Sequence, residues 1–267
     1  MMKIGFIGLG NMGGSLARLV AQDKRFRSEL LLANRSRDKA EKIAAEVGGQ
    51  PVSNAEVFAQ AEVIFLGIKP AQFADLLADY QEVLEKRESL LLVSMAAGLT
   101  LERLEKMTPS HHRWIRIMPN TPVAVGEGVI SYALSQRAKR ADEDLLRELL
   151  SSAGLLLKLD EKQLDAATAL AGCGPAFVYL FIEALADAGV RAGLSRDISL
   201  ELANQTLLGA AKLSQISGQH PAQLKDQVCS PAGSTIAGVA SLEENAFRGT
   251  VMAAVQAAYK RTQELGK

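Results

Sequence analysis

The sequence predicts an α/β protein in which a doubly wound parallel sheet is followed by an all-helical region. Two patterns along the chain support this fold class. As far as about residue 160, short apolar runs alternate with helical patterns, which is typical of a parallel sheet with helices on both faces. From residue 161 onward the patterns are helical only, with no convincing strand. We therefore expect two domains, residues 1–160 and residues 161–267.

A glycine-rich turn follows the first apolar run, residues 4–7, and precedes an amphipathic helical pattern over residues 14–22. Its glycines, Gly8, Gly10 and Gly13, have the G-x-G-x-x-G spacing of dinucleotide-binding sites. The first permits the turn, the second lets the backbone approach a pyrophosphate, and the third lets the helix pack against the strand. Free N–H groups at the start of the helix would bind the phosphates. Glycine triplets also occur in ordinary turns, but the position between strand and helix favours a Rossmann-type nucleotide site.

The end of the second predicted strand, residues 30–33, indicates which dinucleotide binds. Sites selective for NAD usually carry Asp or Glu about 20 residues after the glycines, to bind the ribose 2′-hydroxyl. This chain has Asn34, Arg35 and Ser36 instead, and a guanidinium with a hydroxyl suits the 2′-phosphate of NADP. The alternative is that Arg35 is a solvated residue at the start of the next helix. The pattern predicts NADP(H) as the cofactor, with NAD(H) bound at lower affinity.

The other elements of the first domain continue the alternation. Ligands of open α/β sheets bind outside the carboxyl ends of the strands, so residues that follow the strands should line the cofactor cleft. Lys69 is equally well explained as a surface charge beside a turn proline. Helices are predicted at 38–47, from 53 onward, at 73–84 and at 142–152, and strands at 51–52, 62–66, 90–94, 114–117, 129–134 and 155–159. The candidate cofactor residues are Gly8, Gly10, Asn11, Met12, Asn34, Arg35, Ser36, Ile68, Lys69, Pro70, Ala96 and Ala97.

The second domain contains one helix, residues 175–192, that is apolar over most of its circumference. A small helical domain can hardly bury so much apolar surface, so a second subunit should cover it. We therefore expect a homodimer. The helices predicted in this domain are 164–170, 175–193, 195–217, 221–228, 234–241 and 246–265.

Composition narrows the classes of partner. In 267 residues, 30 Lys and Arg balance 30 Asp and Glu, and the pI is about 6.9, so no net field favours nucleic acid or an anionic membrane. Two cysteines without C-x-x-C spacing and three histidines argue against a disulfide framework and a metal site. The apolar stretch 164–190 is interrupted by glycines, a proline and two acidic residues, which does not suit a membrane span. We expect a cytoplasmic protein.

A second candidate functional segment is residues 230–235, where hydroxyls, a proline and a glycine precede a predicted helix. The backbone N–H groups and the dipole of that helix could bind a carboxylate. An equally good alternative is a capped helix in which Ser230 or Ser234 satisfies the first turn. Hydroxy-acid dehydrogenases of this two-domain type use a lysine on a helix of the second domain, but residues 163–211 contain none. Reduction of a C=N bond fits better, because an imine nitrogen arrives protonated or takes a proton from a hydroxyl or water.

Six segments together resemble the pyrroline-5-carboxylate reductase family, which makes proline by NAD(P)H reduction of a cyclic imine. The resemblance covers essentially the whole chain. Segments 171–177 and 230–235 together are quite specific, whereas many reductases share the glycine motif of residues 8–13. The segments are 8–13, 34–36, 68–70, 116–122, 171–177 and 230–235.

The resemblance implies the residues of the substrate site. The carboxylate of (S)-1-pyrroline-5-carboxylate would meet Ser230 and the backbone of Gly233 and Ser234. Thr235 would be the catalytic residue that faces the ring nitrogen, with water as the alternative source of the proton. Glu161 and Gln227 would line the same pocket. The implied activity is NADPH-dependent formation of L-proline.

Two positions depart from the family pattern. Cys173 stands where the family commonly has Ser, and Ala232 where it commonly has Gly. The second departure matters if the backbone there has a positive φ. The family also forms dimers through interleaved C-terminal helices, often joined into decamers. A β-hydroxyacid dehydrogenase and a non-catalytic NADP sensor remain the rival interpretations.

Overall fold

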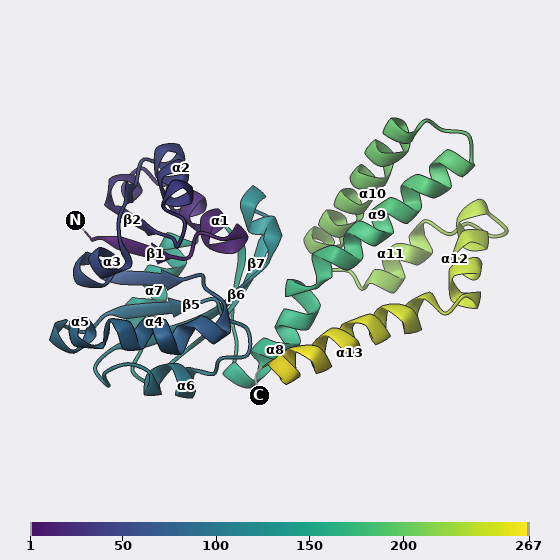
Figure 1. Ribbon diagram of the computed structural model, residues 1–267. Coiled ribbons are helices and arrows are strands. Elements are labelled where there is room, and N and C mark those ends of the chain that lie inside the picture. Colours follow the sequence, from purple (N-terminus) through teal and green to yellow (C-terminus); the bar gives the residue numbers. More distant parts are fainter. Residues whose placement is uncertain (1, 266–267) are drawn as a thin grey trace. The chain divides into compact units, whose positions relative to one another are not determined.

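The computed structural model describes residues 2–265. They form two compact units, one of residues 2–173 with 258–265, and one of residues 174–257. The units thus divide at residue 173, whereas the sequence predicts a boundary at 160. The difference arises because segment 161–173 is held against the sheet by polar contacts of buried residues such as Arg116 and Asn120. Figure 1 shows the sheet of the first unit and the helices of the second.

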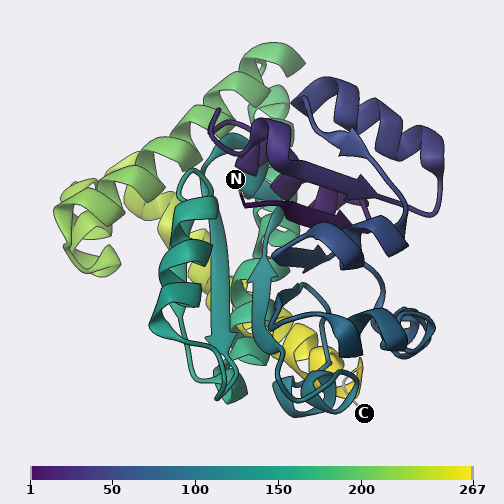
Figure 2. The same cartoon turned by 90° about the vertical axis from the view of Figure 1, so that its left-hand side faces the viewer.

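The first unit is built on an eight-stranded sheet in the order β3-β2-β1-β4-β5-β6-β7-β8. The β6–β7 pair is antiparallel and every other pair is parallel. The expected parallel sheet is therefore confirmed except at this pair, and Figure 2 shows the two teal strands running in opposite directions. The strands are β1 Ile4–Ile7, β2 Leu30–Ala33, β3 Gln50–Pro51, β4 Val63–Leu66, β5 Leu91–Ser94, β6 Arg113–Pro119, β7 Gly128–Leu134 and β8 Gly154–Lys158.

The reversal at β7 has a simple cause. The connection between β6 and β7 runs from residue 120 to 127 and contains only the 3₁₀ turn Thr121–Val125. A parallel pair needs a crossover of about a dozen residues or more, whereas an antiparallel pair can be joined by a short loop. The connection is too short for a helix to carry the chain back across the sheet.

The helices of the first unit cover a sheet whose strands β1, β2, β4 and β5 are fully buried, whereas the edge strands β3 and β8 are mostly exposed. Along β1, Ile4 and Phe6 belong to one apolar cluster and Ile7 to the other, as expected for alternating side chains. The single helix expected at 73–84 is two helices that meet at Tyr80, and the short α6 was not predicted. The helices are α1 Asn11–Val20, α2 Arg37–Val47, α3 Asn54–Gln60, α4 Phe73–Asp79, α5 Gln81–Lys86, α6 Leu101–Lys106, α7 Arg140–Leu149 and α8 Leu164–Ala167.

The second unit is helical, as predicted. Helices α9 and α10 pack against each other as a hairpin (Figure 1). The residues of α13 from 258 onward belong to the first unit. The helices are α9 Gly174–Arg191, α10 Arg196–Ser217, α11 Pro221–Gln227, α12 Ser234–Glu244 and α13 Phe247–Leu265.

Most of the apolar surface of α9 is uncovered within the chain. Ala186 is its only buried residue, while the side chains of Tyr179 and Leu180 are 58% and 65% exposed. By length and composition alone, the helical stretch 161–191 could cross a membrane, with a mean hydropathy of 1.7 and 11% of its most apolar window buried. This exposed face agrees with the burial argument for a second subunit.

Candidate active site

The three glycines of the first turn have three different environments. Gly8 has φ +89°, and a side chain there would lie 2.6 Å from the carbonyl oxygen of Gly67. Gly13 packs so closely on the Gly8 carbonyl that it has no room for a side chain. Gly10, in contrast, has no atom within 4 Å of the place where a Cβ would stand. Two of the glycines are therefore required by packing, and Gly10 leaves an open space at the start of α1.

The open space at Gly10 fits a phosphate group. Gly10 is the N-cap of α1, and no side chain among the described residues caps this helix. The first N–H groups of α1 therefore lack the usual acceptors, and a bound anion can accept from them. The groove that the sequence predicts for a dinucleotide has the backbone donors that a pyrophosphate requires.

Asn34 braces the glycine turn from the end of β2. The backbone N–H of Leu9 donates to Asn34 Oδ1 over 3.0 Å, and Asn34 Nδ2 donates to the carbonyl of Ser36 over 3.2 Å. The side-chain amide thus ties the turn after β1 to the turn after β2. Arg35 and Ser36 beside it are exposed.

A groove of about 450 Å³ lies at the carboxyl end of β1. It contains six of the predicted cofactor residues: Gly8, Gly10, Asn34, Arg35, Ile68 and Lys69. Sequence reasoning missed Asn54, Gln72, Asp75, Leu76 and Asp79, which also line it. Their helical patterns carry no signal of this, because only the strand order brings the segments after β3 and β4 to the end of β1. The predicted residues that do not line this groove are Asn11, Met12, Ser36, Pro70, Ala96 and Ala97.

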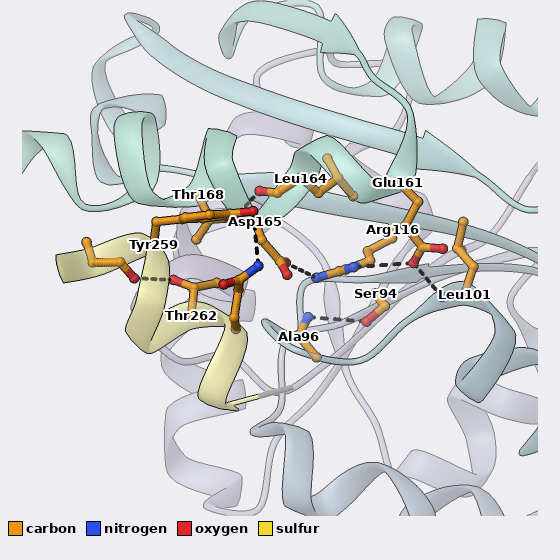
Figure 3. A network of polar contacts seen from close by, with 12 residues as sticks. Ser94, Ala96, Leu101, Arg116, Glu161, Leu164, Asp165, Thr168, Tyr259 and Thr262 are labelled. Carbon is orange, nitrogen blue, oxygen red and sulfur yellow. Dashed lines mark hydrogen bonds and ion pairs between the residues drawn. The ribbon is translucent and has the colours of Figure 1, made fainter. Parts of the chain in front are cut away.

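A second feature of the first unit is a buried arginine on β6. The Arg116 side chain is 3% exposed, and it contacts two carboxylates (Figure 3). Its Nη1 lies 3.3 Å from Glu161 Oε1, and its Nη2 lies 3.1 Å from Asp165 Oδ1. Glu161 Oε1 also accepts from the backbone N–H of Leu101 over 2.6 Å. The carboxylate of Glu161, which the resemblance assigns to the substrate pocket, therefore already has two partners.

Asn120, after β6, holds the segment that leads into α9. Its Oδ1 accepts from the Val129 N–H over 2.8 Å, and its Nδ2 donates to the carbonyl of Ala171 over 3.0 Å. Ala171 lies in a π-helical turn, Thr168–Gly172, closed by a bond of 3.0 Å from Cys173 N to the Thr168 carbonyl. Such turns are frequent at functional sites.

The predicted anion corner of the second unit lies at the start of α12. The N-cap is Gly233, and no side chain among the described residues caps this helix. The capped-helix alternative, with Ser230 or Ser234 as the cap, is therefore not what the structure shows. The side chains of Ser230, Ser234 and Thr235 are exposed. This start of a helix offers free N–H donors next to hydroxyl groups.

Comparisons with known proteins match both parts of the chain. A family model described as pyrroline-5-carboxylate reductase dimerisation matches residues 161–265, and one described as NADP oxidoreductase, coenzyme F420-dependent, matches residues 3–98. The pyrroline-5-carboxylate reductase of Pisum sativum is 45% identical over 264 residues, which cover 98% of this chain and 95% of that protein. The chain belongs to the pyrroline-5-carboxylate reductase family.

Solved structures of the family agree along the whole chain. The Plasmodium falciparum pyrroline carboxylate reductase with NADP bound is 36% identical, with a TM-score of 0.86 over 100% of this chain and 98% of that one. A pyrroline-5-carboxylate reductase from Coxiella burnetii is 30% identical, with a TM-score of 0.90 over 100% and 99%. As a member of this family, the chain is an NADP(H)-dependent oxidoreductase, and its second unit lies within the matched dimerisation region.

One departure from the family pattern has a structural consequence. Ala232 has φ +58°, in the left-handed region that glycine adopts most readily. The presence of Ala at this position, where the family commonly has Gly, therefore matters, because the backbone has a positive φ. Gly233, the next residue, has extended backbone, and a side chain there would collide with the hydroxyl of Ser230.

The remaining predicted residues have other contacts. Gln227, at the end of α11, donates from Nε2 to Gln219 Oε1 over 2.9 Å. Cys173 and Cys229 are both free and partly buried. Among the described residues, no group of three or more His, Cys, Asp or Glu side chains could hold a metal ion.

Proposed function

We infer that this chain reduces (S)-1-pyrroline-5-carboxylate to L-proline with NADPH, and we propose the residues that carry each part of the reaction. Family membership over the full length supports the activity. The observation that carries the residue assignment is that α1 and α12 both begin at a glycine without a side-chain cap. Each start offers N–H donors to an anion: the cofactor pyrophosphate at α1, and the substrate carboxylate at α12.

On the cofactor side, the residues around Gly10 bind and orient the dinucleotide. The N–H groups of Asn11 and Met12 meet the pyrophosphate in the space that Gly10 leaves open. Arg35 and Ser36, both exposed at the end of β2, hold the 2′-phosphate. When bound, NADPH supplies a hydride from nicotinamide C4. Of the remaining candidate residues, Gly8, Asn34, Ile68 and Lys69 line the same groove, and Pro70, Ala96 and Ala97 are proposed to contact the cofactor outside it.

On the substrate side, the start of α12 holds the carboxylate. The N–H of Gly233 already donates to the Ser230 carbonyl over 3.0 Å, so the N–H groups of Ser234 and Thr235 are the available donors. Gly233 contributes by lacking a side chain, which leaves room for the Ser230 hydroxyl beside the carboxylate. Gln227 lines the same pocket. Positioning of the imine accounts for most of the rate enhancement.

Thr235 is the proposed catalytic residue. Its hydroxyl donates a hydrogen bond to the ring nitrogen as the carbon accepts hydride, and water can complete the transfer of the proton. A neutral hydroxyl is sufficient, because the imine nitrogen is basic. Helix α9, which is described over its whole length, contains no lysine, whereas a hydroxy-acid dehydrogenase would need one there.

The first prediction concerns Thr235. Replacing Thr235 by Ala should lower kcat by about tenfold or more, because a donor to the reacting nitrogen is lost, while the Kd for NADPH stays near wild type. Thr235→Ser keeps the hydroxyl and is the matched control, with kcat close to wild type. Both are measured by NADPH oxidation with the pyrroline carboxylate. An unchanged kcat in the alanine variant would contradict the catalytic role of Thr235. If the wild-type protein did not turn over the pyrroline carboxylate, the proposed activity itself would be contradicted.

The cellular form of the enzyme is part of the proposal. We propose a homodimer, assembled further into decamers, in the cytoplasm. The exposed apolar face of α9 supports the dimer, and two free cysteines agree with a reducing compartment. Cell fractionation tests the location, and a protein found only in the membrane fraction would contradict it.

A further inference from the structure

Arg116 is a buried charge whose position is unusual for a purely structural residue. It lies in the middle of β6, directly beside Ser94 of β5 in the sheet register. Its Nε is buried without a hydrogen-bond partner among the described residues. Burying a guanidinium is costly, and replacing such ion pairs by apolar residues is often neutral or stabilising. Stability alone therefore gives little reason for this cluster.

The two carboxylates differ in what they contact besides Arg116. Glu161 Oε1 accepts both from Arg116 and from the N–H of Leu101, over 3.3 Å and 2.6 Å. Within the described part of the chain, Asp165 makes no hydrogen bond to the backbone of the 95–101 segment, and its partner is Arg116, 3.1 Å away. Leu101 is the first residue of α6, so its N–H has no acceptor within the helix. Glu161 is thus the acceptor for the Leu101 N–H, and the Thr100 hydroxyl caps the same end of α6 by accepting from the Arg103 N–H over 3.3 Å.

The hydrogen bond to Leu101 lies at the end of a loop that contains two candidate cofactor-binding residues. Residues 95–100 connect β5 to α6 and contain Ala96 and Ala97, which the proposed function places against NADPH. At the start of the loop, Ser94 Oγ accepts from the Ala96 N–H over 3.2 Å (Figure 3). At its end, Glu161 accepts from Leu101 (Figure 3). Hydrogen bonds therefore fix the loop at both ends, and the acceptor at the second end is Glu161, 60 positions away from Leu101 in the chain.

We propose that Glu161 is a positioning residue for the cofactor loop. Arg116 orients the Glu161 carboxylate, and Glu161 holds the loop 95–100 in the position that NADPH meets. Asp165 balances the charge of Arg116 without contacting the loop. This inference rests on the proposed function, because that function places Ala96 and Ala97 at the cofactor.

The test compares variants at the two carboxylates. Glu161→Met keeps the length of the side chain but removes the acceptor, and Glu161→Gln keeps a weaker, neutral acceptor. Asp165→Ala is the matched control, since it removes the other partner of Arg116. Two quantities are measured: amide hydrogen exchange of the peptide 95–104 in the protein without nucleotide, and the Kd for NADPH by fluorescence.

We expect a graded result at Glu161. Exchange in peptide 95–104 should be fastest in Glu161→Met and intermediate in Glu161→Gln, and the Kd for NADPH should rise about three- to tenfold in the methionine variant. Asp165→Ala should lower Tm but leave both quantities near wild type. If Glu161→Met fails to fold, a wild-type exchange rate in Glu161→Gln overturns the inference. Equal changes in the Glu161 and Asp165 variants also overturn it, because the cluster would then only stabilise the fold.

The same experiment separates this inference from the proposed function. Exchange is measured without nucleotide, so it reports on the loop wherever NADPH binds. Faster exchange with an unchanged Kd would show that Glu161 fixes the loop but that the loop does not position NADPH, which overturns the inference. Failure of the proposed function would appear instead as a wild-type enzyme that does not oxidise NADPH with the pyrroline carboxylate.

Discussion

His112 shows how this fold treats a buried titratable side chain. Its exposed fraction is 1%, its Nδ1 lies 3.1 Å from the N–H of Leu90, and its Nε2 lies 3.0 Å from the carbonyl of Leu84. These partners assign the neutral tautomer with the proton on Nε2. Burial, with the neighbouring His111 as the second cause, lowers the pKa of His112 from 6.5 to about 4. The residue lies far along the sheet from the glycine turn and belongs to the architecture of the first unit.

Stability should therefore depend on pH through His112. Because its pKa is lowered in the folded state, the unfolded state binds more protons between pH 6.5 and about 4. The free energy of unfolding should fall by about 1–3 kcal/mol as the pH decreases through that window, and the contribution is fully present above it. Urea unfolding at several pH values measures this. His112→Gln is the control, and an equally steep pH dependence in that variant would contradict the assignment.

At the scale of elements, the turns after β1 and β2 decide what the first unit binds. Gly10 opens the start of α1, and Asn34 joins the two turns through Leu9. Arg35 is exposed and lines the groove, whereas Arg37 at the start of α2 is paired with Glu41 at 2.9 Å. Two arginines close in sequence thus have different environments, and they offer a controlled test of cofactor choice.

We expect Arg35→Ala to raise the Kd for NADPH about tenfold, because a charge-assisted contact to the 2′-phosphate is lost. The Kd for NADH should change little, since NADH has a hydroxyl at that position. Arg37→Ala is the control and should leave both constants near wild type. Fluorescence titration with each nucleotide measures the effect. If Arg35→Ala raised the Kd for NADPH and for NADH equally, the assignment of Arg35 to the 2′-phosphate would be contradicted.

Elements are also where sequence reasoning was least complete. Most strands and helices of both units follow from apolar periodicity, but α6 and the break between α4 and α5 at Tyr80 do not. The direction of β7 was wrong because apolar alternation is the same in parallel and antiparallel strands. Only the length of the connection 120–127 carries the signal.

At the scale of the whole molecule, a single chain leaves a large apolar surface on the second unit uncovered. Leu180 on α9, Ile216 on α10 and Met252 on α13 are 65%, 73% and 67% exposed. The matched family model, described by dimerisation, covers all three positions. A second copy of the chain is the simplest cover for such a surface.

Sedimentation at low micromolar concentration should therefore show a dimer or a larger assembly. Leu180→Glu should shift the protein toward monomer, because a charge would be buried at the interface. Val125→Glu, at a 76% exposed apolar position of the first unit, is the matched control and should leave the mass unchanged. A wild-type monomer under these conditions would contradict the homodimer.

The sequence by itself determined the fold class, the glycine motif, residues 230–235 as a candidate anion site, and the family, whereas only the structure shows that α12 begins without a side-chain cap. These depend on local spacing and composition, which a single chain displays directly. The tertiary structure decided the order of the strands, the further lining residues such as Asp75, and the positive φ of Ala232. It also decided that Glu161 contacts Arg116 and Leu101, because residues 45 and 60 positions apart meet only after the sheet has formed.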